Sequence, residues 1–297
     1  MSQTNKNLKS GVIYILLSAV CFTFMNAFVR LAGDIPSMQK SFFRNFIALI
    51  FAFILLKSKK IPIKTKKKEN LKFLILRSVL GTIGILGNFY AVDKLVLADA
   101  SMLNKMSPFF GVLFSFIFLK ENLKPFHVIA LVTAFLGSLF IIKPSFENLL
   151  LVPAIIGFIG GVSAGGAYTT VRYLGEKGES KLYIVFFFSS FSCLTTLPYL
   201  LFNYHHMSLG QLGFLILAGL AATGGQFSIT AAYTHAPARE ISVYDYSQVI
   251  FSAVLGYIIF QQTPDKYSFL GYAIIISMAV LMFFFNKKEH NKSELKE

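Results

Sequence analysis

The chain has 297 residues, 55% of them hydrophobic and 14% charged, and its mean hydropathy is +0.63. Because a soluble domain carries about 25% charged residues, this composition excludes an ordinary water-soluble globule. The net charge of +14 comes mainly from basic residues in short segments between apolar runs, a pattern typical of membrane topology signals rather than of a nucleic-acid partner. The sequence therefore predicts a polytopic membrane protein.

Ten apolar stretches follow one another along the chain. They cover residues 11–31, 38–56, 71–92, 96–119, 125–142, 150–172, 182–202, 209–233, 241–260 and 267–286. At about 20 residues per span, ten spans would use about 200 residues and leave short loops and tails. Their interiors lack regular two-residue alternation, which favours helices over an outer-membrane barrel. We expect an all-α membrane protein with ten transmembrane helices.

The distribution of Lys and Arg between these stretches predicts the orientation. With the N-terminus in the cytoplasm, the inside segments hold 19 basic residues, seven of them within 57–70, and the outside loops hold Lys94, Lys143 and Lys266. Cytoplasmic loops carry an excess of Lys and Arg. This asymmetry predicts that both termini are cytoplasmic and that the protein lies in the inner (cytoplasmic) membrane.

The chain also contains a weak internal repeat. Residues 89–121 overlay residues 229–261 at a constant offset of 140, with few identities but matching hydropathy and short loops. Two halves of five helices must insert with opposite orientations because five is odd. We therefore predict two inverted repeats, residues 1–145 and 146–297, a plan common in secondary transporters.

Several local motifs make the chain resemble a known family. The segment A-S-M-L-N-K-M-S-P-F-F-G, followed by L-K-E-N-L with Glu121, and the sequence Phe42-Phe43-Arg44 are similar to the drug/metabolite transporter superfamily, EamA-type branch. Gln248 and Gln261 depart from that pattern, where the family would favour Pro and Glu. The resemblance implies transport of a small molecule across the lipid bilayer, with neither enzymatic activity nor a cofactor.

A weaker similarity concerns two short strings in the second half. Tyr244-Asp245-Tyr246 and Pro264-Asp265-Lys266 resemble the subgroup that contains S-adenosylmethionine transporters. S-adenosylmethionine or a nucleotide-like metabolite is therefore an alternative substrate.

Two ionisable residues occur inside apolar stretches at equivalent positions of the repeat. Lys105 and Asp245 are related by the offset of 140, and a charge at the centre of a lipid-facing helix costs about 2.5–3.5 kcal/mol. Both side chains are therefore expected to face the interior, either as a structural ion pair or as a central pair for which substrate or a proton competes.

The depth of the other basic residues within their apolar stretches predicts different roles for them. Lys40 is expected to extend to the membrane interface, and Arg30 and Arg77, close to helix ends, are expected to be anchors. Arg44 lies deeper, so we expect it to face a cavity and grip a carboxylate or phosphate.

Polar residues at helical spacing predict an interior path between the helices. The candidate substrate-binding residues are Asn26, Arg44, Asn88, Tyr90, Lys105, Tyr168, Gln226, Tyr244, Asp245, Tyr246 and Gln248. Pro108 can interrupt its helix and is either a kink or a gating hinge. The two cysteines and five histidines show no metal-ligand spacing, so no metal is expected.

These residues suit a secondary-active transporter that works by alternating access. Arg44 and Lys105 would contact an anionic group and Asp245 a cationic one, a mixture that suits amino acids or related zwitterions. Asp245 is also the candidate for proton coupling. A lipid-handling or scaffold protein is the alternative of another class, and the chain is expected to be a monomer or homodimer.

Overall fold

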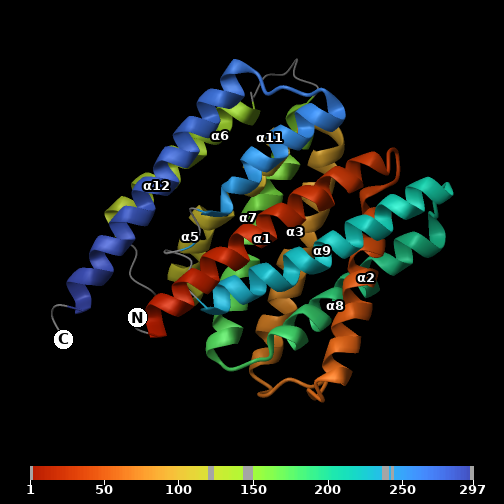
Figure 1. Cartoon of the computed structure of the whole chain (residues 1–297), viewed down its shortest axis with the longest axis horizontal. Helices are drawn as coiled ribbons and strands as arrows, with labels where there is room; N and C mark the ends of the chain where they lie inside the picture. Colours follow the sequence, from red (N-terminus) through yellow and green to blue (C-terminus); the bar gives the residue numbers. More distant parts are fainter. Residues whose placement is uncertain (1–2, 120–123, 143–149, 236–240, 242–243, 295–297) are drawn as a thin grey trace.

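The computed structural model describes residues 3–119, 124–142, 150–235, 241 and 244–294, and within these ranges its regular secondary structure is helical (Figure 1). The helices are α1 (Gln3–Leu31), α2 (Ser37–Ser58), α3 (Asn70–Lys94), α4 (Leu97–Asn104), α5 (Ser107–Leu119), α6 (Pro125–Ile142), α7 (Leu151–Glu176), α8 (Lys181–Phe202), α9 (Leu209–His235), α11 (Ser247–Phe260) and α12 (Lys266–Glu294). In this part of the chain nine segments are long and apolar enough to cross a membrane, α4 and α5 together forming one of them, and α11 is a shorter apolar helix. The predicted all-α membrane fold is confirmed.

The helices of the two halves pack on one another in a symmetric pattern. With five crossings per half, α1 corresponds to α7, and α3 corresponds to α9. Helix α1 packs on α9 and α3 packs on α7, so these two interfaces are equivalent. Two further interfaces join helices that correspond directly, α2 with α8 and α6 with α12. Helix α4 packs on α11, whose residues correspond to α5 at the offset of 140. The α6–α12 pair forms one flank of the molecule, and α1 begins on the side where α12 ends (Figure 1).

The fourth crossing is interrupted in its middle, whereas its continuous apolar run predicted one helix. Lys105 and Met106 form a turn between α4 and α5. Pro108 explains the interruption, because it has no backbone N–H and its ring clashes with the carbonyl four residues earlier.

The ninth crossing is interrupted at the equivalent place. Tyr246 lies in a turn immediately before α11, and the offset of 140 relates it to Met106. Gln248 stands where the first half has Pro108, so the second break forms without a proline. Glu121 of the family motif lies outside the described residues.

Helix α7 packs directly on the first of these breaks. A Cβ atom at Gly161 would clash with the main-chain oxygen of Leu103, and one at Gly165 would lie 2.6 Å from the main-chain oxygen of Ser107. Only glycine allows two backbones to approach so closely. The G-x-x-x-G spacing of α7 therefore holds the broken crossing in place.

Several basic side chains are buried in the interior of the bundle. Arg44, Arg77, Lys40 and Lys105 are among the largest fully buried side chains. Buried charges are expensive unless they are paired or functional. The partners of these four groups therefore locate the candidate site.

Candidate functional site

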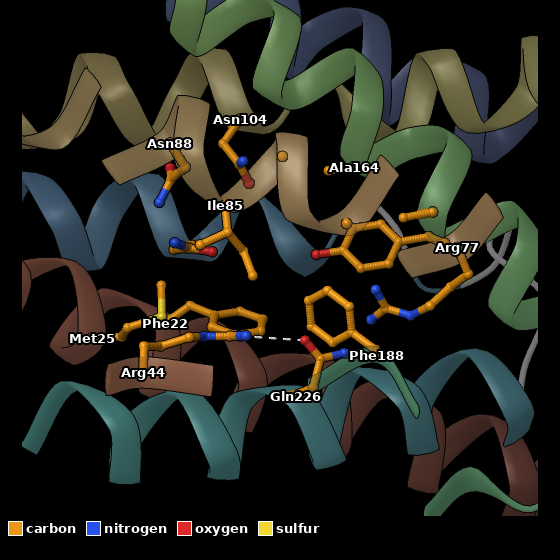
Figure 2. A pocket seen from close by; sticks show the side chains of 15 residues that line it. Phe22, Met25, Arg44, Arg77, Ile85, Asn88, Asn104, Ala164, Phe188 and Gln226 are labelled. Carbon is orange, nitrogen blue, oxygen red and sulfur yellow. Dashed lines mark hydrogen bonds between the residues drawn. The ribbon is translucent and has the colours of Figure 1, made fainter. Parts of the chain in front are cut away.

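A cavity that opens to solvent lies between the two halves, and its empty space, counted together with the open solvent at its mouth, is about 540 Å³ (Figure 2). Helices α1, α2, α3 and α4 line it from the first half, and α7, α8, α9 and α11 line it from the second. The lining residues are Phe22, Met25, Arg44, Arg77, Gly81, Gly84, Ile85, Asn88, Asn104, Ala164, Ala167, Tyr168, Phe188, Gln226 and Gln248.

Arg44 on α2 faces this cavity, as the sequence predicts. Its guanidinium donates hydrogen bonds to Oδ1 of Asn45 at 2.6 Å and to Oε1 of Gln226 at 3.3 Å. Asn45 is held in turn by a 2.8 Å bond to the hydroxyl of Ser192 on α8. The Nε of Arg44 finds no partner among the described residues, so this buried cation is positioned by neutral groups and keeps a free donor.

Arg77 on α3 also lies in the cavity, which the sequence did not predict. It is 2% exposed, and its guanidinium carbon lies 3.7 Å from the ring centroid of Phe188. Its Nε and one terminal nitrogen lack hydrogen-bond partners within the described ranges. A Cβ at Gly81, one turn along the helix, would clash with the guanidinium. The interpretation of Arg77 as an interface anchor is therefore wrong.

Amide side chains and Tyr168 supply the remaining polar groups of the wall. Asn88 donates a 2.9 Å hydrogen bond to Asn26 on α1. The oxygens of Asn88 and Gln248 and the Nε2 of Gln226 have no partner in the part of the chain that the structure describes. The cavity thus offers both acceptors and donors beside an apolar surface.

Lys105 and Asp245 form the central ion pair, at 2.8 Å and with both side chains buried. The Tyr246 hydroxyl donates a 2.9 Å bond to the carbonyl of Lys105. The hydroxyls of Ser101 and Ser252 meet at 2.7 Å along the same interface. The pair joins the two broken crossings directly, and neither member lines the cavity.

The structure brings together part of the predicted set. Arg44, Asn88, Tyr168, Gln226 and Gln248 line the cavity, and Asn26 supports it through Asn88. Besides Asn26, the predicted residues that do not line it are Tyr90, Lys105, Tyr244, Asp245 and Tyr246.

Two of the predicted aromatic residues serve other contacts. Tyr244 is 39% exposed, and its ring packs edge-on against Phe283 with centroids 6.2 Å apart. Tyr246 is buried at the Lys105 carbonyl. Contact of these residues with a substrate stays a prediction.

Sequence reasoning missed Arg77, Asn104 and Phe188 as lining residues. The sequence could have predicted an inward-facing Arg77, because Gly81 follows it by one helical turn and leaves room for its side chain. Phe188 carried no such signal, since it stands within a run of three phenylalanines.

At one end of the bundle, polar contacts connect α2 to its neighbours. Lys40 is fully buried and forms a 2.6 Å ion pair with Asp93 of α3, so its prediction as an interface anchor is wrong. The side-chain amide of Gln39 exchanges two hydrogen bonds with the backbone of His205, at 2.8 and 2.9 Å. These bonds join the first half to a loop of the second.

At the other end, Glu179 joins the lysine-rich connection 59–69 to the second half. Its Oε1 accepts hydrogen bonds from the Thr65 hydroxyl, the backbone N–H of Lys66 and the Asn70 amide, at 2.7, 2.8 and 2.8 Å. Burial acts to raise the pKa of Glu179, but the hydrogen bonds from Asn70, Thr65 and the backbone outweigh it and hold the pKa below its ordinary value.

Comparison with known proteins places this architecture among transporters. The sequence profile of the EamA-like transporter family matches the chain twice, over residues 9–143 and 151–284. The chain is similar to the pseudopaline exporter CntI of Pseudomonas aeruginosa strain UCBPP-PA14, with 30% identity over 277 residues that cover 93% of this chain and 96% of that protein. It is 31% identical over 279 residues to an uncharacterized transporter of Helicobacter pylori strain J99, covering 92% and 94% of the two chains.

More distant similarities also cover most of the chain. Solute carrier family 35 member G1 of Homo sapiens is 27% identical over 285 residues, which cover 91% of this chain and 78% of that protein. A solved crystal structure matches with a TM-score of 0.69 and 14% identity, covering 93% of this chain and 98% of the other. At that identity the likeness concerns the fold alone.

Proposed function

We propose that the chain, which belongs to the EamA-like transporter family, is a secondary-active transporter that works by alternating access. Its substrate would be a small carboxylate-bearing metabolite of the amino-acid or related zwitterionic type. Its family and relatives identify it as a multi-pass membrane transporter. The substrate class and the mechanism are the proposal.

Arg44 is the observation that carries the proposal. Its buried guanidinium faces a cavity between the halves, and its hydrogen-bond acceptors among the described residues are the neutral side chains of Asn45 and Gln226. A planar guanidinium with free donors binds a carboxylate in a charge-assisted, often bidentate, manner. The unpaired oxygens of Asn88 and Gln248 would accept hydrogen bonds from an ammonium group.

The ends of the bundle support alternating access. Gln39 and His205 close one end across the two halves, and Glu179 closes the other. A transporter of this kind opens one such closure at a time around a fixed central site. The similarity to a protein named as an exporter favours export as the direction of transport. We place both termini and the 59–69 connection in the cytoplasm, because the positive-inside rule puts segments rich in Lys and Arg there.

Asp245 is the candidate for coupling to protons. It is the carboxylate at the meeting point of the broken crossings, and its ion pair with Lys105 would open when Asp245 takes a proton. Acidic residues in transmembrane helices serve as proton relays in many transporters.

Counterflow into proteoliposomes tests the proposal. Liposomes with purified protein would be preloaded with an unlabelled compound and supplied with the same compound in radiolabelled form, for a panel of amino acids, S-adenosylmethionine and a nucleotide. We expect accumulation of carboxylate-bearing amino-acid compounds and its loss in Arg44→Gln, while Arg172→Gln, outside the cavity, retains it. Accumulation unaffected by Arg44→Gln would contradict the assigned site, and no accumulation of any compound would favour a scaffold or lipid-handling role.

A further inference from the structure

We infer that the cavity takes an organic anion with two acidic groups, one held by Arg44 and the other by Arg77, with the ring of Phe188 between them. This inference rests on the proposed function and narrows its substrate class from carboxylate-bearing metabolites in general to compounds with at least two carboxylates.

The charge of the cavity wall is the first argument. Two guanidinium groups line the cavity, and its described lining residues include no carboxylate. The central carboxylate, Asp245, is already paired with Lys105 at 2.8 Å. Two cations in a low-dielectric cavity favour a ligand of net negative charge, since an unbalanced buried charge is expensive.

The other two buried cations, Lys40 and Lys105, each have a carboxylate partner within the protein. Lys40 is paired with Asp93 at 2.6 Å, and Lys105 with Asp245 at 2.8 Å. Arg44 and Arg77 are as deeply buried, yet the polar contacts that hold Arg44 are to neutral groups. We therefore assign the carboxylates that would pair with Arg44 and Arg77 to the substrate.

The geometry lets one small molecule reach both arginines. They come from adjacent helices, α2 and α3, and their guanidinium carbons lie 5.8 and 3.7 Å from the centroid of the same Phe188 ring. Figure 2 shows the ring between the two side chains, with both guanidinium groups turned toward it.

The free donors lie on these same groups. The Nε of Arg44 and the Nε and one terminal nitrogen of Arg77 lack partners within the described chain. Gly81 leaves the space that the Arg77 guanidinium occupies. A short carbon chain over the Phe188 ring would place one carboxylate at each arginine.

Matched pairs of compounds test the number of acidic groups. Counterflow would be measured with glutamate against glutamine, aspartate against asparagine, and succinate against succinamate, so that each pair differs by one carboxylate. We expect the diacid of each pair to be preferred at least about tenfold, the effect of one charge-assisted hydrogen-bonded contact. Equal transport within the pairs would overturn the inference and leave the proposed function intact, whereas transport of no compound would overturn both.

Variants then separate the two arginines. Arg77→Gln should reduce transport of the diacid much more than transport of the monoacid and so remove the preference, while Arg44→Gln should reduce both to a similar extent. Gly81→Ala should act like Arg77→Gln, because its methyl group displaces the guanidinium without removing it. Each variant would be checked for thermal unfolding and monodispersity beside Arg172→Gln. A folded Arg77→Gln protein that keeps the full diacid preference would overturn the inference.

Discussion

Lys105 and Asp245 occupy equivalent positions in the two inverted halves and meet in a buried ion pair of 2.8 Å. Each lies at the break of its own crossing, and the Tyr246 hydroxyl binds the Lys105 carbonyl beside them. The two irregular segments are therefore joined by an ion pair between side chains and by a hydrogen bond from a side chain to the backbone. We therefore expect the two breaks to move together.

Loss of one member of this pair should destabilise the protein more than loss of both. Lys105→Ala leaves Asp245 as an uncompensated buried charge, which costs about 3–5 kcal/mol. The double variant Lys105→Met with Asp245→Leu removes both charges and should recover most of that loss. Thermal unfolding in detergent would measure the difference, and additive losses in the double variant would contradict the coupling.

Asp245→Asn should uncouple transport from the proton gradient. The amide keeps the size of the side chain but takes up no proton, so we expect counterflow to persist while acceleration by an imposed pH gradient disappears. Asp93→Asn, which alters the carboxylate at the end of the bundle, serves as the control and should retain the response. If Asp245→Asn proteins still respond to the gradient, Asp245 does not couple protons.

Glu179 should stabilise the protein in a pH-dependent manner. Because its pKa is lowered in the folded protein, its contribution is fully present above the ordinary carboxyl pKa and is lost as the pH falls through the lowered value. Glu179→Gln should therefore unfold at a lower temperature than the parent at pH 7, by the equivalent of about 1–3 kcal/mol. The difference should shrink below pH 4.5. A difference that is constant from pH 7 to pH 3 would show that the charge is not involved.

Gly161→Ala should destabilise the fold through backbone crowding. The added methyl group meets the main-chain oxygen of Leu103, and overpacking of this kind costs about 1–3 kcal/mol. Gly213 in α9 offers a matched control, since a Cβ there meets nothing within 4 Å. Gly213→Ala should be neutral or stabilise its helix by up to about 1 kcal/mol, and equal effects of the two changes would contradict the packing argument.

Labelling with an impermeant thiol reagent in intact cells would test the orientation. Cys21 and Cys193 are free thiols and would first be replaced by alanine. The exposed Lys64→Cys lies in the lysine-rich connection and should be protected. The exposed His206→Cys lies at the opposite end and should react. The reverse pattern would invert the topology.

Hydropathy predicted the crossings because burial in lipid constrains every residue of a span. It could not place the breaks at Met106 and Tyr246, since both lie inside continuous apolar runs. Pro108 gave a reason for the first break, whereas the sequence analysis predicted no break in the second half, where Gln248 stands in place of the proline.

The candidate site was predicted in part for a similar reason. Arg44 was recognised because it lies too deep in its span to reach the interface. Lys40 and Arg77 lie closer to span ends, where a long side chain can extend outward as easily as inward. Tertiary contacts decide which way each side chain turns. Lys40 turns inward to its ion pair with Asp93. Arg77 turns inward to the ring of Phe188, in the space that Gly81 leaves.

The pairing of two helices with their own counterparts, α2 with α8 and α6 with α12, carries a consequence for the proposed transport cycle. If each half adopts the shape that its twin now has, these two interfaces re-form between the same helices. The contacts of α5 with α7 and of α2 with α9 would instead exchange with those of α1 with α11 and of α3 with α8. The two self-paired interfaces therefore need not separate during that exchange.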